Sequence, residues 1–77
     1  MSFIYVNWSK ASDCTGYEMQ VSKSKKFKTY DSYTTSDKNY NVYRTKGTYY
    51  IRVRSYKQIG NTKYYGSFSS VKAVTIK

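Results

Sequence analysis

Residues 48–56, which read Thr-Tyr-Tyr-Ile-Arg-Val-Arg-Ser-Tyr, alternate between two kinds of side chain along the segment. A period of two is the signature of a half-buried strand, and β-branched and aromatic residues suit a pleated sheet better than a helix. The segment is therefore predicted to form a central strand. Its inward face is expected to carry Tyr49, Ile51 and Val53, and its outward face Tyr50, Arg52, Arg54 and Tyr56.

The composition extends this prediction to the whole chain. The 77 residues include eleven tyrosines and no leucine, which favours an all-β protein over a helical one. Turn signals separate about six short strands, the pattern of an antiparallel β-sandwich formed by a single domain over residues 1–77. Strands are expected near residues 3–8, 17–21, 29–35, 40–43, 48–56 and 69–77.

Two local features refine this picture. Apolar residues near the end of the chain are spaced by three instead of two, which predicts a bulge near Lys72 and Ala73. Phe27 is the one apolar residue expected to anchor the basic connection at residues 22–28, and Trp8 is expected to anchor the core. The predicted core consists of Val6, Trp8, Tyr17, Met19, Tyr49, Ile51 and Val53.

The residue types argue against catalysis. Histidine is absent, Cys14 is the only cysteine and only four residues are acidic. Neither a nucleophile with its base nor a metal-ligand cluster can be assembled from them, so no enzyme activity, metal or cofactor is expected. Asp31 and Asp37, the nearest approach to a carboxylate pair, are interpreted as turn residues. Cys14 is interpreted as a half-buried filler of a loop instead of a reactive thiol.

The charge points to anionic partners. Fourteen Lys and Arg against four Asp and Glu give a net charge of +10, which predicts attraction to nucleic acid, anionic glycans or anionic cell-wall polymers. No apolar run is long enough to span a membrane, and no export signal stands near the start.

Four segments resemble fibronectin type III domains, which have an immunoglobulin-like fold. They are residues 6–10 (Val-Asn-Trp-Ser-Lys), 15–20 (Thr-Gly-Tyr-Glu-Met-Gln), 47–56 and 66–69 (Gly-Ser-Phe-Ser). They are most similar to the Lys- and Tyr-rich versions in secreted or wall-attached proteins of Gram-positive bacteria. The resemblance implies a non-catalytic extracellular or cell-surface module that acts as a spacer and as an adhesion or assembly unit, with another protein or an anionic polymer as partner.

The resemblance also implies structural roles. Trp8 would be the core tryptophan of the second family strand, B, and residues 66–69 would open the last strand, G. Tyr49 would be the corner tyrosine, whose ring packs inside while its hydroxyl satisfies a nearby backbone group.

Two features depart from the family pattern. No leucine precedes Gly47, so Val42 or Tyr43 must take its place. The first family strand, A, is missing or truncated before Val6, which would leave the edge of strand B unpaired. Self-assembly by strand addition at that edge is therefore a further candidate function.

The outward side chains of the central strand form the main candidate binding surface. Alternating aromatic and guanidinium groups could stack on sugars or bases and neutralise sulfates or phosphates, as in a small nucleic-acid-binding β module. The alternative is a solvated face on which Glu18 pairs with Arg52 or Arg54. A following loop and the basic connection add further candidates. The full candidate set is Tyr50, Arg52, Arg54, Tyr56, Lys57, Ile59, Tyr64, Tyr65, Lys23, Lys25, Lys26 and Lys28.

Overall fold

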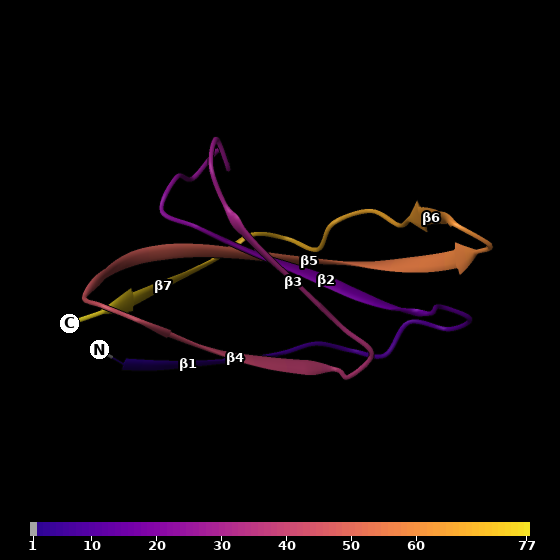
Figure 1. Ribbon diagram of the computed structural model, residues 1–77. Coiled ribbons are helices and arrows are strands. Elements are labelled where there is room, and N and C mark those ends of the chain that lie inside the picture. The colour runs from indigo at the N-terminus through magenta and orange to yellow at the C-terminus, as the bar shows by residue number, and fades with distance from the viewer. Residues whose placement is uncertain (1) are drawn as a thin grey trace.

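The computed structural model describes residues 2–77, and these residues form an all-β, sandwich-like structure of antiparallel strands (Figure 1). No helix of the described chain has the length and apolar character needed to cross a membrane. The predicted all-β character is confirmed. The strands are β1 (Ser2–Asn7), β2 (Gly16–Ser22), β3 (Asp31–Thr35), β4 (Asn39–Arg44), β5 (Gly47–Ile59), β6 (Thr62–Tyr65) and β7 (Lys72–Ile76).

β5 is the central strand of the larger sheet, as the alternation of residues 48–56 predicted. One edge of β5 pairs with β2, which in turn pairs with β3. The other edge pairs with β7 along the first part of β5 and with β6 along the last part. The smaller sheet consists of β1 and β4, and it lies below the larger sheet in Figure 1. β5 is longer than predicted because it continues into a hairpin with β6.

The core lies between the two sheets. Ile4 and Val42 from the smaller sheet belong to the same buried cluster as Met19, Ile51 and Ile76 from the larger one. Five of the predicted core residues are buried as expected, namely Tyr17, Met19, Tyr49, Ile51 and Val53.

Trp8 does not anchor the core. Val6 and Trp8 are only partly buried and pack against its margin, and the Trp8 ring meets Tyr17 edge-on with centroids 5.6 Å apart. The reason is that β1 has a partner strand on one edge only. The indole Nε1 of Trp8 is buried without a hydrogen-bond partner within residues 2–77.

Tyr49 fixes the start of β5. The Tyr49 hydroxyl donates a hydrogen bond to the backbone oxygen of Thr45, with an O···O distance of 2.9 Å, so the predicted bond to a nearby backbone group is confirmed. Val42 is buried whereas Tyr43 is exposed. Of these two residues, Val42 is therefore the one that contributes to the core.

The end of the chain differs from the prediction. β7 begins at Lys72, and residues 66–69 lie in the connection before it. The bulge expected near Lys72 and Ala73 is wrong, because both residues pair with β5 in unbroken register. The strand β6 was not predicted, because the sequence pattern indicates a loop over its four residues.

The strand alternation is interrupted earlier, at residues 66–71. Tyr65 lies opposite Tyr56 and Lys72 lies opposite Ile51, so this connection is two residues longer than the stretch of β5 that it follows. Backbone bonds from Gly66 to Ser55 and from Ser69 to Val53 keep the connection along β5. The extra length displaces the side chains of residues 66–71 from strand alternation.

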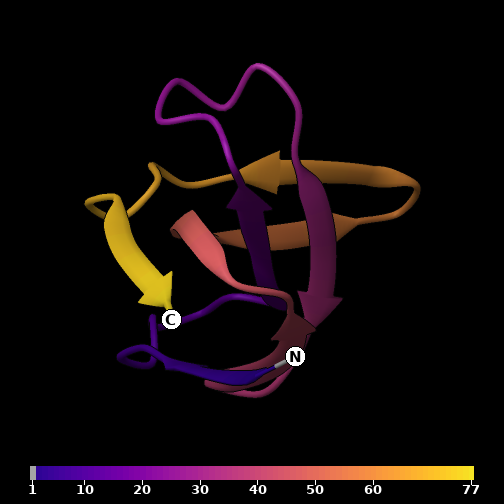
Figure 2. The same ribbon diagram turned by 90° about the vertical axis from the view of Figure 1, so that its left-hand side faces the viewer.

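The molecule is elongated, with extents of 42 × 23 × 20 Å. Figure 1 shows that β1 begins and β7 ends at one end of the long axis, and that the β5–β6 hairpin lies at the other end. In the end-on view of Figure 2, β1 and β4 form the lower layer and β7 lies at one side of the molecule. The hairpin is therefore the part of the fold farthest from both described ends of the chain.

Candidate functional site

Arg52 and Arg54 stand on the outer face of β5 because Ile51 and Val53, which alternate with them, face the core. The guanidinium carbon of Arg52 lies 4.1 Å from the ring centroid of Phe27 and 4.0 Å from that of Phe68. Each arginine of this face is stacked between aromatic rings, a favourable contact of a cation with the ring faces.

The second arginine continues the row. The guanidinium carbon of Arg54 lies 4.5 Å from the Phe68 centroid and 3.6 Å from the Tyr65 centroid. Phe68 is thus shared between Arg52 and Arg54, whose positions along the strand are roughly 7 Å apart by strand geometry. We refer to the row Phe27, Arg52, Phe68, Arg54 and Tyr65 as the ladder.

Polar side chains of β2 form hydrogen bonds with the two arginines of the ladder. Arg52 donates from Nε to Oε1 of Gln20 at 2.8 Å, and Arg54 donates from Nε to Oε1 of Glu18 at 2.6 Å. Gln20 in turn donates to Oε2 of Glu18, and Ser32 on β3 does the same. Gln20 is 2% exposed, and its amide is satisfied because both of its ends take part in these bonds.

Glu18 is the acid of this network. Burial raises the pKa of Glu18, but hydrogen bonds from Ser32, Gln20 and Arg54 together with the charge of Arg54 outweigh burial and hold that pKa below its usual value. Glu18 is therefore ionised at neutral pH. The pairing of Glu18 with one of the two arginines, which was expected for the alternative of a solvated face, is found for Arg54.

The ladder leaves part of each guanidinium available. The protein engages the Nε atoms and the faces of Arg52 and Arg54, whereas within residues 2–77 no hydrogen bond reaches their Nη atoms. The Arg54 side chain is 24% exposed. Such fixed, planar donors suit the paired oxygens of a carboxylate, phosphate or sulfate.

Phe27 closes one end of the ladder. It lies in the loop between β2 and β3, is 7% exposed, and follows a turn in which its N–H donates to the Ser24 carbonyl at 3.0 Å. Its φ of 54° is in the left-handed region, which is unfavourable for a bulky residue. In this conformation the Phe27 ring stacks on the Arg52 guanidinium, which is a favourable contact. The predicted role of Phe27 as the anchor of this connection is confirmed.

Phe68 is the ladder residue that sequence reasoning missed. It follows Tyr65 by three residues, a spacing that a regular strand would place on opposite faces. The longer connection at residues 66–71 brings both rings onto the arginines. A lengthened connection leaves no periodic signal in the sequence, so only the presence of an aromatic residue here could have suggested it.

Tyr56 extends the row toward the hairpin. Its ring centroid lies 6.2 Å from that of Tyr65, and the Lys63 ammonium lies 4.8 Å from its ring centroid. Gly16 lies opposite Tyr56, and a Cβ at Gly16 would lie 2.8 Å from the backbone oxygen of Thr35 and 3.0 Å from the Tyr56 side chain. Gly16 is thus required chiefly by the close approach of the β3 backbone, and the Tyr56 ring packs over the space that it leaves.

The hairpin presents the remaining candidates. Ile59, next to its turn, and Tyr64, opposite Lys57, are exposed. Lys57 forms an ion pair with Asp13 at 2.8 Å, and the hydrogen bond and charge of Lys57 lower the pKa of Asp13. The Lys57 ammonium therefore already has a partner in the protein, whereas Ile59 and Tyr64 contact solvent.

The lysines of the basic connection divide into two groups. Lys25, Lys26 and Lys28 are exposed around Phe27. Lys23, which is also exposed, lines a hollow of about 440 Å³, where its ammonium lies 5.6 Å from the Tyr49 ring centroid. Tyr50 is half-buried opposite Ser22 and Ala73, apart from the ladder contacts.

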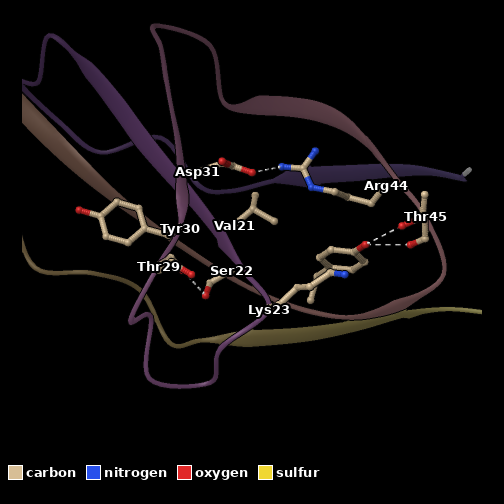
Figure 3. Close-up of a pocket in the computed structure, with 9 residues that line it drawn as sticks. Val21, Ser22, Lys23, Thr29, Tyr30, Asp31, Arg44 and Thr45 are labelled. Atoms are coloured by element: carbon tan, nitrogen blue, oxygen red, sulfur yellow. Dashed lines mark hydrogen bonds and ion pairs between the residues drawn. The ribbon is translucent and has the colours of Figure 1, made fainter.

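The hollow near Lys23 is shown in Figure 3. Arg44 crosses it to pair with Asp31 at 3.0 Å, and the Ser22 hydroxyl donates to the Thr29 carbonyl at 2.6 Å. Arg44 also donates to the Tyr33 hydroxyl and to the Tyr43 carbonyl. These bonds connect residues of the protein to one another. The hollow is therefore interpreted as a structural contact between the β2–β3 loop and the β4–β5 turn.

The residues considered for catalysis lie apart from the ladder. Asp31 is engaged by Arg44, and Asp37 lies in the turn after β3, where its N–H donates to the Thr35 hydroxyl. Cys14 is partly buried and donates to the Ala11 carbonyl at 3.5 Å. A hydrogen bond with Cys14 raises the pKa of Tyr17. Within residues 2–77 no group of three His, Cys, Asp or Glu side chains could hold a metal ion.

Comparison of the chain with protein-family models, with curated proteins and with solved structures gave no match.

Proposed function

We propose that the chain is a non-catalytic module of a secreted or cell-surface protein, of the fibronectin type III kind, that serves as a spacer and an adhesion unit. Its partner would be an anionic cell-wall polymer or glycan bound along the ladder. The observation that carries this proposal is the state of Arg52 and Arg54, whose faces and Nε atoms are held by the protein while their Nη atoms are not.

Two features support the fibronectin type III part of the proposal. The strand order β3-β2-β5, with β6 and β7 on the far edge of β5, faces the β1–β4 pair. Tyr49, near the start of β5, has its hydroxyl bonded to the backbone four residues earlier, at Thr45, as a corner tyrosine does in such sandwiches.

The charge distribution supports an anionic partner. Three of the four acidic residues are engaged in ion pairs, with Arg44, Arg54 and Lys57. The remaining cations are largely unbalanced. Lys25, Lys26 and Lys28 flank the Phe27 end of the ladder, and Lys63 lies near its other end. A long anion following the ladder would meet positive charge over its whole length and release its counterions.

The position of the ladder supports adhesion. It runs along β5 toward the hairpin, which is the end of the molecule farthest from the beginning of β1 and the end of β7 (Figure 1). Exposed Ile59 and Tyr64 lie at that end. A partner bound there would be held at a distance from the parts of the chain next to its two ends.

The test compares guanidinium with ammonium at constant charge. The double variant Arg52→Lys/Arg54→Lys keeps the net charge and removes the planar, paired donors. We expect its affinity for dextran sulfate and for polyphosphate, measured by calorimetry, to fall about tenfold. Arg44→Lys, which lies off the ladder, is the matched control and should change affinity less than about twofold. Neutral dextran should not bind.

Equal affinity of the double variant and the parent would mean that the overall field, and not the ladder, attracts polyanions, and the site assignment would fail. Tighter binding of a single-stranded oligonucleotide than of both test polymers would replace the proposed partner with nucleic acid. Thermal unfolding of each variant verifies that the compared proteins are folded.

A further inference from the structure

The two arginines of the ladder differ in the side chain that accepts their Nε hydrogen. Arg52 donates to the neutral amide of Gln20 at 2.8 Å, whereas Arg54 donates to the carboxylate of Glu18 at 2.6 Å. Glu18 therefore balances the charge of Arg54, while within residues 2–77 Arg52 has no partner in an ion pair. An anionic group that approaches Arg54 meets the negative charge of Glu18 as well.

Hydrogen bonds hold Glu18 beside Arg54. Its Oε1 accepts from Arg54, and its Oε2 accepts from the Gln20 amide at 3.1 Å and from the Ser32 hydroxyl at 2.7 Å. The Glu18 side chain is 12% exposed. Because both carboxylate oxygens are engaged, turning the side chain away would leave these donors without their acceptor. The negative charge therefore stays next to Arg54 when a ligand binds.

Positive charge resumes on the far side of Arg54. The Lys63 ammonium lies 4.8 Å from the ring centroid of Tyr56. Tyr56 follows Arg52 by four positions on β5, which is roughly 13 Å by strand geometry. At the other end of the ladder, the exposed lysines 25, 26 and 28 extend the positive charge beyond Arg52. The surface thus presents unbalanced cations on both sides of one balanced pair.

This charge pattern defines the polymer that fits the ladder. A polymer with an anion on every unit would place one of its anions against Glu18, at a cost in repulsion. A polymer with spaced charges avoids that contact. The Nη atoms of Arg54 are still available as donors, since within residues 2–77 no hydrogen bond reaches them, and neutral hydroxyl groups are suitable acceptors for them.

We propose that the ladder selects an anionic glycan whose charged sugars are separated by neutral sugars, with an anionic group bound at Arg52 and hydroxyl groups of a neutral sugar bound at Arg54. This inference rests on the proposed function, because it names the class of polymer that the same surface binds. Glu18 is then the residue that determines specificity. It forms no bond to the glycan, and its charge excludes an anion from the Arg54 position.

The test compares two glycans that carry the same anionic group at different spacing. Hyaluronate has a carboxylate on every second sugar, and polygalacturonate has one on every sugar. Oligosaccharides of equal length are prepared from both polymers, and their affinities for the 77-residue chain are measured by calorimetry. Any difference between the two then reports charge spacing instead of the kind of anion.

The first variant is Glu18→Gln, which removes the charge and keeps an oxygen that accepts from the Arg54 Nε. We expect its affinity for the polygalacturonate oligosaccharide to rise about fivefold, and its affinity for the hyaluronate oligosaccharide to change less than about twofold. Asp31→Asn is the matched control, because it changes the net charge equally but removes the partner of Arg44, off the ladder. It should change either affinity less than about twofold.

Single lysine variants test the same inference without altering Glu18. Arg52→Lys and Arg54→Lys both keep the net charge and remove one planar guanidinium each. Arg52→Lys should weaken binding of the hyaluronate oligosaccharide about fivefold, because it acts on the bound anion. Arg54→Lys should weaken it by about twofold or less, because it acts on a neutral sugar. Thermal unfolding verifies that the compared variants are folded.

Three results would overturn the inference. One is a change in polygalacturonate affinity that is the same for Glu18→Gln and Asp31→Asn, which would reduce Glu18 to its share of the net charge. Another is an equal loss of hyaluronate affinity in both single lysine variants, which would place an anion at each arginine. The third is a parent chain that binds dextran sulfate but not hyaluronate. The proposed function fails by a different result, namely equal binding of dextran sulfate by the parent and the double lysine variant.

Discussion

Phe68 should be the most informative residue of the ladder to remove, because it is shared by two arginines. Its centroid lies 4.0 Å from the Arg52 guanidinium and 4.5 Å from that of Arg54. A cation–ring contact at a partly exposed site contributes about 0.5–1 kcal/mol, so the two contacts together contribute about 1–2 kcal/mol. Loss of the half-buried ring adds part of its apolar transfer free energy.

We therefore expect Phe68→Ala to lower the free energy of unfolding by about 2–3 kcal/mol. Phe68→Leu keeps apolar bulk but loses the ring faces, and should cost about 1–2 kcal/mol. Val71→Ala lies in the same connection, outside the ladder, and its side chain is exposed. It should change stability by less than about 0.5 kcal/mol.

Urea unfolding followed by the fluorescence of Trp8, the single tryptophan, measures these differences. In thermal unfolding, each kcal/mol should correspond to roughly 4–8 °C for a domain of this size. The reasoning is refuted if Phe68→Leu is as stable as the parent, because the stacked rings would then contribute nothing beyond their apolar bulk.

Three further changes test other parts of the account. Met19→Ala, at a fully buried core position, should cost about 2–5 kcal/mol in urea unfolding; a cost below about 1 kcal/mol would contradict the assigned core. Tyr49→Phe removes the bond to the Thr45 carbonyl and should cost about 0.5–1.5 kcal/mol, and no loss of stability would show that the corner bond is dispensable. Because the folded-state pKa of Glu18 is lowered, its contribution to stability is present above its unfolded pKa of about 4.3 and is lost as pH falls through the folded value. The stability advantage of the parent over Glu18→Gln should therefore shrink below about pH 4 in urea midpoints taken across pH; an advantage that grows with acidity would contradict the assigned pKa direction.

The central strand and most of the core could be predicted because alternation is a local property of the chain. Tyr49, Ile51 and Val53 occupy every second position, and the sheet buries that face as a unit. Trp8 was assigned too large a role, because the burial of a residue at a strand end depends on whether a further strand covers it. That information lies outside the local pattern.

The ladder was predictable in part. The outward position of Arg52 and Arg54 and the pairing of Glu18 follow from strand register. The rings that stack on them do not, because Phe27 lies in a turn with positive φ and Phe68 lies in a connection two residues longer than its partner strand. Irregular backbone places these side chains, and irregular backbone has no period to detect.

The most direct test of the account is a titration of the protein with dextran sulfate followed by the ¹⁵N resonances of the arginine side chains in nuclear magnetic resonance. Arg44 serves as an internal reference because Asp31, Tyr33 and the Tyr43 carbonyl already engage its guanidinium. The account predicts that the Nη resonances of Arg52 and Arg54 shift first and saturate together, while those of Arg44 stay unchanged. Shifts of equal size at all three arginines, or none at Arg52 and Arg54, would contradict the claim that the ladder is the binding surface.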